Sequence, residues 1–142
     1  GYGRRGQRVT RALAIARRPH DDGGGGDGGV DTARFAATVP ADYLLFEGHF
    51  TGYRVLAGGA QLHELVLPCL RRLCGELPAL TGLDGVKFLA RIGPGDAVDV
   101  VLRRADGGSR VPFEIRRGDT RCTAGRATFA APLPPFPPHG AG

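Results

Sequence analysis

Residues 46–74 read FEGHFTGYRVLAGGAQLHELVLPCLRRLC, a glycine-containing loop followed by a long apolar segment. The segment from Gly58 to about Cys74 carries apolar side chains at helical spacing, namely Leu62, Leu65, Val66, Leu70 and Leu73. This spacing predicts one main helix that is apolar around much of its circumference and is therefore covered on most sides. Pro68 interrupts the pattern, so we expect either a kink or a second helix that starts at Pro68.

Segments with alternating apolar residues lie on both sides of this helix. Alternation predicts strands with one buried face, and short turns between them produce antiparallel neighbours. The expected strands are a first one around Phe35–Val39, a short one at Val86–Phe88, two at Val98–Leu102 and Val111–Ile115, and a last one from about Thr120 to Ala130. One helix against one antiparallel sheet is an α+β layout.

The 142 residues suit a single domain with flanking segments. We expect a flexible, basic and glycine-rich N-terminal segment at 1–29, the folded domain at 30–131, and an extended proline-rich tail at 132–142. Within the first segment, residues 7–18 fit a short basic helix. They fit an edge strand equally well, because Leu13 and Ile15 alternate.

Composition narrows the classes of function. No run of 18 or more apolar residues predicts a membrane span, and no apolar segment typical of a signal peptide follows the N-terminus. Three cysteines without metal-ligand spacing favour a reduced, cytoplasmic protein that has neither disulfides nor a metal site. The net charge of +5 comes almost wholly from arginine, but aromatic residues that could stack on bases are not interleaved with it, so nucleic acid is not an expected ligand.

The loop before the helix carries the most specific pattern. Gly48-His49-Phe50, with Gly58 nine residues after the histidine, resembles the Gly-His-Phe-Pro…Pro-Gly signature of hotdog-fold 3-hydroxyacyl-[acyl-carrier-protein] dehydratases. Gln61-Leu62 resembles the branch of that family associated with aryl-polyene synthesis. Further matches follow in the family's order at Val86-Lys87-Phe88, Pro94-Gly95-Asp96, Phe113-Glu114-Ile115 and Gly125-Arg126.

The resemblance implies a hotdog fold, in which an antiparallel sheet wraps around a central helix, and a defined reaction. A hydro-lyase would remove water from a 3-hydroxyacyl thioester and leave a trans-2-enoyl thioester, as in fatty-acid, polyene or polyketide biosynthesis. The substrate would arrive on the phosphopantetheine arm of an acyl carrier protein, with no cofactor of the enzyme's own. Two subunits would form a homodimer with shared active sites.

The family pattern places the catalytic histidine at His49. Imidazole ionises near pH ~6.5, so it is suited to take the weakly acidic C2 proton of a thioester at neutral pH. The resemblance puts the backbone N–H of Gly58 against the thioester oxygen, where a helix N-terminus stabilises developing negative charge. Phe50 and Gly59, which neighbour these two residues, are the other expected substrate contacts.

The second catalytic group departs from the family pattern. An Asp or Glu usually stands fourteen residues after the histidine, and here that position is His63, followed by Glu64. At about 100° per residue, His63 borders the apolar face of the helix and Glu64 points nearly opposite. His63 could donate the proton to the departing hydroxyl, or Glu64 could do so if the helix is wound differently.

Two other functions remain open on the sequence. The missing carboxylate, and the Thr51, Arg54 and Ala57 that stand where the family has prolines, fit a non-catalytic domain that binds acyl thioesters. Glu64 on the helix also fits a hotdog acyl thioesterase. The arginine pairs, such as Arg71-Arg72 and Arg103-Arg104, are candidates for docking an acidic carrier protein.

Overall fold

The computed structural model describes residues 13–19, 29–39, 46–47, 55–56, 61–93 and 95–139. In this part of the chain six strands form one antiparallel sheet in the order β1-β2-β6-β7-β8-β5, and β3 pairs with β4 in a separate sheet. The strands are β1 (Ile15–Arg18), β2 (Thr32–Thr38), β3 (Phe46–Glu47), β4 (Val55–Leu56), β5 (Leu80–Phe88), β6 (Ala97–Arg103), β7 (Arg110–Arg117) and β8 (Thr120–Phe129).

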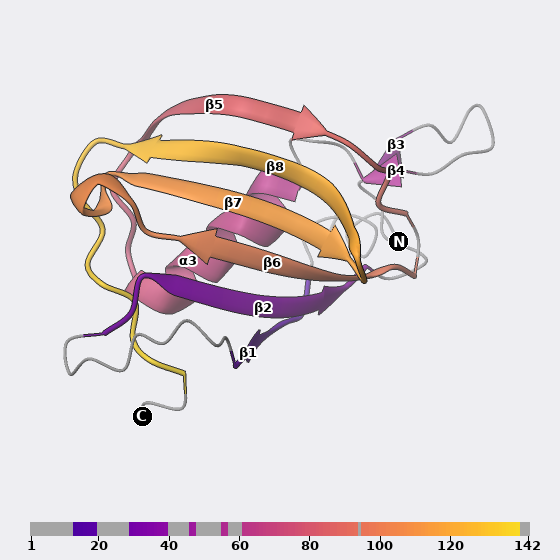
Figure 1. The fold of residues 1–142 in the computed structure, drawn as a ribbon, viewed down its shortest axis with the longest axis horizontal. Helices are drawn as coiled ribbons and strands as arrows, with labels where there is room; N and C mark the ends of the chain where they lie inside the picture. Colours follow the sequence, from indigo (N-terminus) through magenta and orange to yellow (C-terminus); the bar gives the residue numbers. More distant parts are fainter. Residues whose placement is uncertain are drawn as a thin grey trace, which may run out of the picture.

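The main helical segment lies across one face of the curved six-stranded sheet (Figure 1). It consists of a π-helical turn, η2 (Leu62–Val66), followed by α3 (Leu67–Cys74), while a short 3₁₀ turn, η3 (Asp106–Gly108), joins β6 to β7. The apolar side of the helix faces the sheet, and Leu65, Val66 and Leu70 are fully buried there. A helix covered by an antiparallel sheet is the hotdog arrangement, so the predicted α+β hotdog fold is confirmed.

The winding of the helix changes just before Pro68. Pro68 has no N–H and cannot donate to a carbonyl of the preceding turn. The helix accommodates it with a wider turn, in which the N–H of Leu67 bonds to the carbonyl of Leu62, and α3 then starts with Pro68 in its first turn. The predicted disturbance at Pro68 is therefore a change from π-helical to α-helical winding.

The inner face of the sheet is built from rows of side chains that cross several strands. In one row, Phe35 pairs with Val100, Val100 with Ile115, Ile115 with Thr123, and Thr123 with Phe88. The first three are fully buried and Thr123 is 2% exposed, whereas Phe88, on the edge strand β5, is 60% exposed. The core therefore ends before the β5 edge, and apolar side chains of that strand are left uncovered.

The segment around residue 15 forms a strand, which decides one of the open alternatives. Ile15–Arg18 pair with β2 as the edge strand β1, and the rest of 7–18 that precedes Leu13 lies outside the described residues. Asp99 on β6 accepts from Arg18 on β1 at 2.9 Å and from Arg34 on β2 at 2.5 Å. This carboxylate links the outer faces of the three strands.

The proline-rich C-terminal segment is extended, and two of its side chains belong to the core. Leu133 is 1% and Phe136 0% exposed. The backbone N–H and C=O of Phe136 both bond to Val30 at 2.8 Å, and Arg104 Nε donates to the carbonyl of Leu133 at 2.9 Å. At least residues 133–136 are thus packed with the domain that was expected to end at residue 131.

Gly125 allows β5 and β8 to approach closely. A Cβ at this position would lie 2.9 Å from Val86 Cγ2 and 3.0 Å from Phe113 Cζ, both on the sheet's inner side. We expect Gly125→Ala to lower the free energy of unfolding by about 1–3 kcal/mol, because overpacking forces its neighbours apart. Urea denaturation would measure the loss. Gly82→Ala, on β5 with nothing within 4 Å of the added Cβ, is the matched control, and equal stability of the two variants would contradict this account.

Candidate active site

The structure describes only part of the predicted site. His49, Phe50, Gly58 and Gly59 lie outside the described residues. The backbone of His63 is described within the π-helical turn, though its side chain is not, and Glu64 is described and half-buried. The geometry of the site is therefore built from the helix start and from the strands around it.

Gln61, which directly precedes the π-helical turn, is 5% exposed. Its Oε1 accepts a hydrogen bond of 2.5 Å from the hydroxyl of Thr123 on β8. Neither residue was predicted as a site residue, although two signals were available. Gln61 is a polar residue at the start of an apolar helix pattern, and Thr123 is a hydroxyl at an inward-facing position of β8.

One side of the helix faces the β5 edge of the sheet. Leu67 and Arg71 line a hollow of about 340 Å³ together with Leu80 on β5 and Phe129 on β8. His63 lies within the π-helical turn and precedes Leu67 by four residues.

The β5 edge carries an apolar surface. Leu80, Leu83, Phe88 and Leu89 are exposed by 36%, 45%, 60% and 51%, respectively. In the described part of the chain β5 pairs only with β8, so its other side presents unpaired backbone groups. An edge strand with exposed large apolar side chains is typical of a protein–protein contact.

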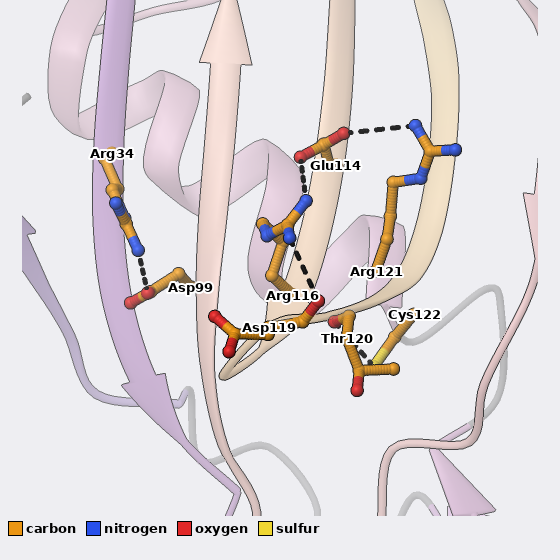
Figure 2. A network of polar contacts seen from close by, with 8 residues as sticks. All are labelled: Arg34, Asp99, Glu114, Arg116, Asp119, Thr120, Arg121 and Cys122. Carbon is orange, nitrogen blue, oxygen red and sulfur yellow. Dashed lines mark hydrogen bonds and ion pairs between the residues drawn. The ribbon is translucent and has the colours of Figure 1, made fainter.

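The outer face of the sheet is polar and rich in arginine. Glu114 on β7 accepts from Arg116 at 3.1 Å and from Arg121 on β8 at 3.4 Å, and Arg116 also donates to the carbonyl of Asp119 (Figure 2). A hollow of about 790 Å³ lies on this face, with Lys87 and Arg103 among its lining residues. The helix lies across the other face of the sheet (Figure 1).

Several of the arginines that were expected to dock a carrier protein contact other parts of this chain instead. Arg104 binds the carbonyls of Leu133 and Gly107 and pairs with Asp31 at 3.2 Å. Arg116 belongs to the outer-face network. Arg71 is exposed and lines the hollow next to β5.

The cysteines are free thiols. Cys69 is fully buried against the core, and this burial raises its pKa to about 12. Burial also raises the pKa of Cys74, which is half-buried. Because the thiolate is the reactive and metal-binding form, neither side chain is suited to nucleophilic chemistry at neutral pH.

Two classes of feature are missing from the residues that the structure describes. They contain no group of three or more His, Cys, Asp or Glu side chains that could hold a metal ion. In the same residues, the helices are all too short or too polar to cross a membrane.

A comparison with protein families gives the context for these residues. The family model of ApeI-like proteins, described as ApeI dehydratase, matches residues 27–126. The chain belongs to this family. The matched range includes the loop with His49 and the whole described helix, so this ApeI-like chain carries the predicted site within the family's own domain.

Solved structures support the same fold at low sequence identity. The dehydratase heterocomplex ApeI:P from Xenorhabdus doucetiae is similar with a TM-score of 0.62 and 17% identity, over 75% of this chain and 93% of that chain. The R-hydratase PhaJ1 from Pseudomonas aeruginosa is similar with a TM-score of 0.51 and 17% identity, over 80% of this chain and 92% of that chain. The hexameric thioesterase y2039 from Yersinia pestis is similar with a TM-score of 0.52 and 14% identity, over 77% of this chain and 96% of that chain. At these identities the likeness concerns the fold.

Proposed function

We propose that the protein is a 3-hydroxyacyl thioester dehydratase. The observation that carries this proposal is the match of the dehydratase family model to residues 27–126, which contain Gly48-His49-Phe50 and the helix that follows. The described fold supports it, because a helix buried against an antiparallel sheet follows this motif in the sequence.

In the proposed reaction His49 takes the C2 proton of the thioester as general base. Negative charge then develops on the thioester oxygen, and the N–H of Gly58 stabilises it. The C3 hydroxyl leaves as water after it receives a proton, and a double bond forms between C2 and C3. The chemistry uses proton transfers alone and calls for no metal or redox cofactor.

The proton donor is proposed to be His63, with Glu64 as the alternative. The family pattern supports His63, because residue 63 stands fourteen residues after His49, where the family has its acidic residue. Glu64 is the alternative because both residues lie in the π-helical turn. In this turn the angle between successive side chains differs from the α-helical value that would direct Glu64 away from His63. His63→Ala and Glu64→Ala, assayed separately, would identify the donor.

Hydration of a crotonyl thioester, followed by the loss of enoyl absorbance, tests the proposal in the reverse direction. The purified protein is expected to catalyse this hydration and to release no free thiol from an acyl-CoA. Thiol release without hydration would favour a thioesterase. A protein that binds a carrier-linked acyl chain without converting it would favour a non-catalytic domain and would overturn the proposed activity.

The active site is proposed to be completed by a second copy of the chain. The exposed apolar row of β5 and its unpaired backbone edge would pair with the same edge of the partner in a two-fold contact. The hollow beside Leu67 and Arg71 opens at this edge, so the partner's loop could reach the helix there. The expected assembly is a homodimer that shares its two sites.

Leu83→Glu is expected to shift this dimer toward monomer. A carboxylate at a buried contact would have to lose its hydration without a partner, which we expect to weaken association by at least about tenfold, or ~1.4 kcal/mol. Analytical ultracentrifugation over a concentration series would measure the change. Ala97→Glu, at an exposed position on β6, which is not a neighbour of β5 in the sheet, is the control. A wild-type protein that stays monomeric would refute the contact.

The substrate is proposed to arrive on an acyl carrier protein in the cytoplasm. Carrier proteins of this kind are acidic, and Arg71 lies exposed beside the hollow near β5. Attraction between exposed charges is screened by salt, so the apparent affinity for the carrier is expected to fall as ionic strength rises.

A further inference from the structure

The strongest unexplained feature is a polar pair inside an apolar layer. Thr123 occupies one position in the row that runs from Phe35 through Val100 and Ile115 to Phe88. Its neighbours in this row are apolar, and Thr123 itself is 2% exposed. In the described residues the buried polar side chains are Gln61, Thr123 and Asp99, and Asp99 is accounted for by its two arginines.

The other two buried polar residues, Gln61 and Thr123, are hydrogen-bonded to each other. The hydroxyl of Thr123 donates to Gln61 Oε1 at 2.5 Å, across 62 positions of sequence. Leaving either group unpaired in the core would cost about 1–3 kcal/mol, whereas replacing both with apolar groups of the same shape would be nearly neutral. Stability alone therefore gives no strong reason for this pair.

A hydrogen bond, unlike apolar packing, depends on the direction in which donor and acceptor point. Its strength falls steeply when the donor and acceptor move apart or turn away. The bond between Gln61 and Thr123 therefore ties the first described residue of the helix to β8 in a defined orientation of donor and acceptor. It does so at the end of β8 that pairs with the exposed Phe88, next to the edge where the second subunit is proposed to bind.

The helix start needs such an anchor because the winding changes behind it. The N–H of Leu67 bonds to the carbonyl of Leu62 across the wider π-helical turn, so the regular α-helical ladder of α3 does not continue to Gln61. The position of the first turn is then not determined by α3 alone. A side-chain bond to the sheet supplies the missing constraint.

We propose that Gln61 and Thr123 are positioning residues for the dehydration site. This role rests on the proposed function. Gln61 follows Gly58, the proposed N–H donor, by three residues and precedes His63 by two. An N–H that stabilises an oxyanion acts over about 2.7–3.1 Å, and a misplacement of about 1 Å can lower a rate as much as 100-fold. The pair acts on the helix start by tying Gln61 to β8.

Three variants test the role. Thr123→Val keeps the shape of the side chain and removes the donor. Thr123→Ser keeps the hydroxyl. Gln61→Leu combined with Thr123→Val replaces the bond by apolar packing. For each variant, kcat and KM for hydration of a crotonyl thioester are measured together with the thermal unfolding midpoint.

Thr123→Val is expected to lower kcat about tenfold with KM changed by less than about twofold, because the site is displaced while thioester binding is largely kept. Thr123→Ser is expected to restore most of kcat. The double variant is expected to regain stability and to stay slow, which a purely structural role would not produce.

Two results would overturn the inference while leaving the dehydratase proposal intact. One is an active wild type with an unchanged kcat in folded Thr123→Val. The other is a double variant that regains kcat together with stability. A wild type that is inert toward enoyl and 3-hydroxyacyl thioesters would overturn the proposed function, and the positioning role with it.

Discussion

Replacing His49 with alanine is expected to lower kcat/KM for hydration of a crotonyl thioester by about 100- to 10,000-fold. The C2 proton is too weakly acidic to be lost to water at a useful rate, so a correctly placed base contributes directly to the barrier. Removal of the imidazole leaves the N–H of Gly58 and the binding of the acyl chain, which together account for the residual rate. The effect should fall on kcat, because the proton is transferred in the transition state.

His139→Ala is the matched control, since His139 is an exposed histidine outside the range matched by the family model. It should leave both kinetic constants unchanged. His63→Ala and Glu64→Ala belong in the same series, and the larger loss identifies the proton donor. If His49→Ala retained full activity with the wild-type unfolding midpoint, the assignment of the base would be wrong, even if the protein were shown to hydrate thioesters.

Strands β2, β6, β7 and β8 could be predicted because each one carries its own signal, whereas the sequence leaves β1 open, predicts only Val86–Phe88 of β5, and predicts a loop where β3 and β4 lie. Alternation at Val98–Leu102 and at Val111–Ile115 corresponds to the buried faces of β6 and β7. The apolar spacing of Leu65, Val66 and Leu70 likewise marks the helix face that meets the sheet. These patterns are local, and burial of one face is enough to produce them.

Features that depend on distant partners could not be predicted in the same way. The bond between Gln61 and Thr123 joins residues 62 positions apart, and no local pattern indicates it. Arg104 was assigned to a docking pair, yet its guanidinium binds carbonyls of the C-terminal segment and of η3. A guanidinium offers five donors, and the tertiary structure decides whether they meet solvent, a partner or the chain's own backbone.

The predicted site rests on the resemblance more than on any periodicity. His49 and Gly58 were assigned from a motif, and the family match includes that motif without testing the role of either residue. The structure adds the surroundings of the helix start, namely the buried polar pair, the π-helical turn and the uncovered β5 edge. The π-helical turn follows from Pro68, whose effect on the winding of the helix cannot be derived from composition.

The C-terminal segment shows how composition can conceal a structural role. Five prolines among the last eleven residues predicted an extended tail. Proline does favour the extended backbone seen here, but that backbone also directs Leu133 and Phe136 into the core. The pair of 2.8 Å hydrogen bonds between Phe136 and Val30 then holds the segment beside the start of β2.

Phe136→Ala is therefore expected to lower the free energy of unfolding by about 3–5 kcal/mol. The side chain is fully buried in the core, and its loss leaves a cavity there. Small domains are stable by only about 5–15 kcal/mol, so the loss is a large part of the total. Ending the chain at Ala131 should cost at least as much, because Leu133 is removed as well.

Urea denaturation followed by far-UV circular dichroism would measure both effects, with activity as a second readout. Pro138→Ala, an exposed position in the same segment, should change stability by less than about 0.5 kcal/mol. A chain ending at Ala131 that unfolds at the wild-type urea midpoint would show that the packing of Leu133 and Phe136 contributes nothing. The domain would then end at residue 131, as its composition suggests, and the contacts at Val30 and Arg104 would have no part in its stability.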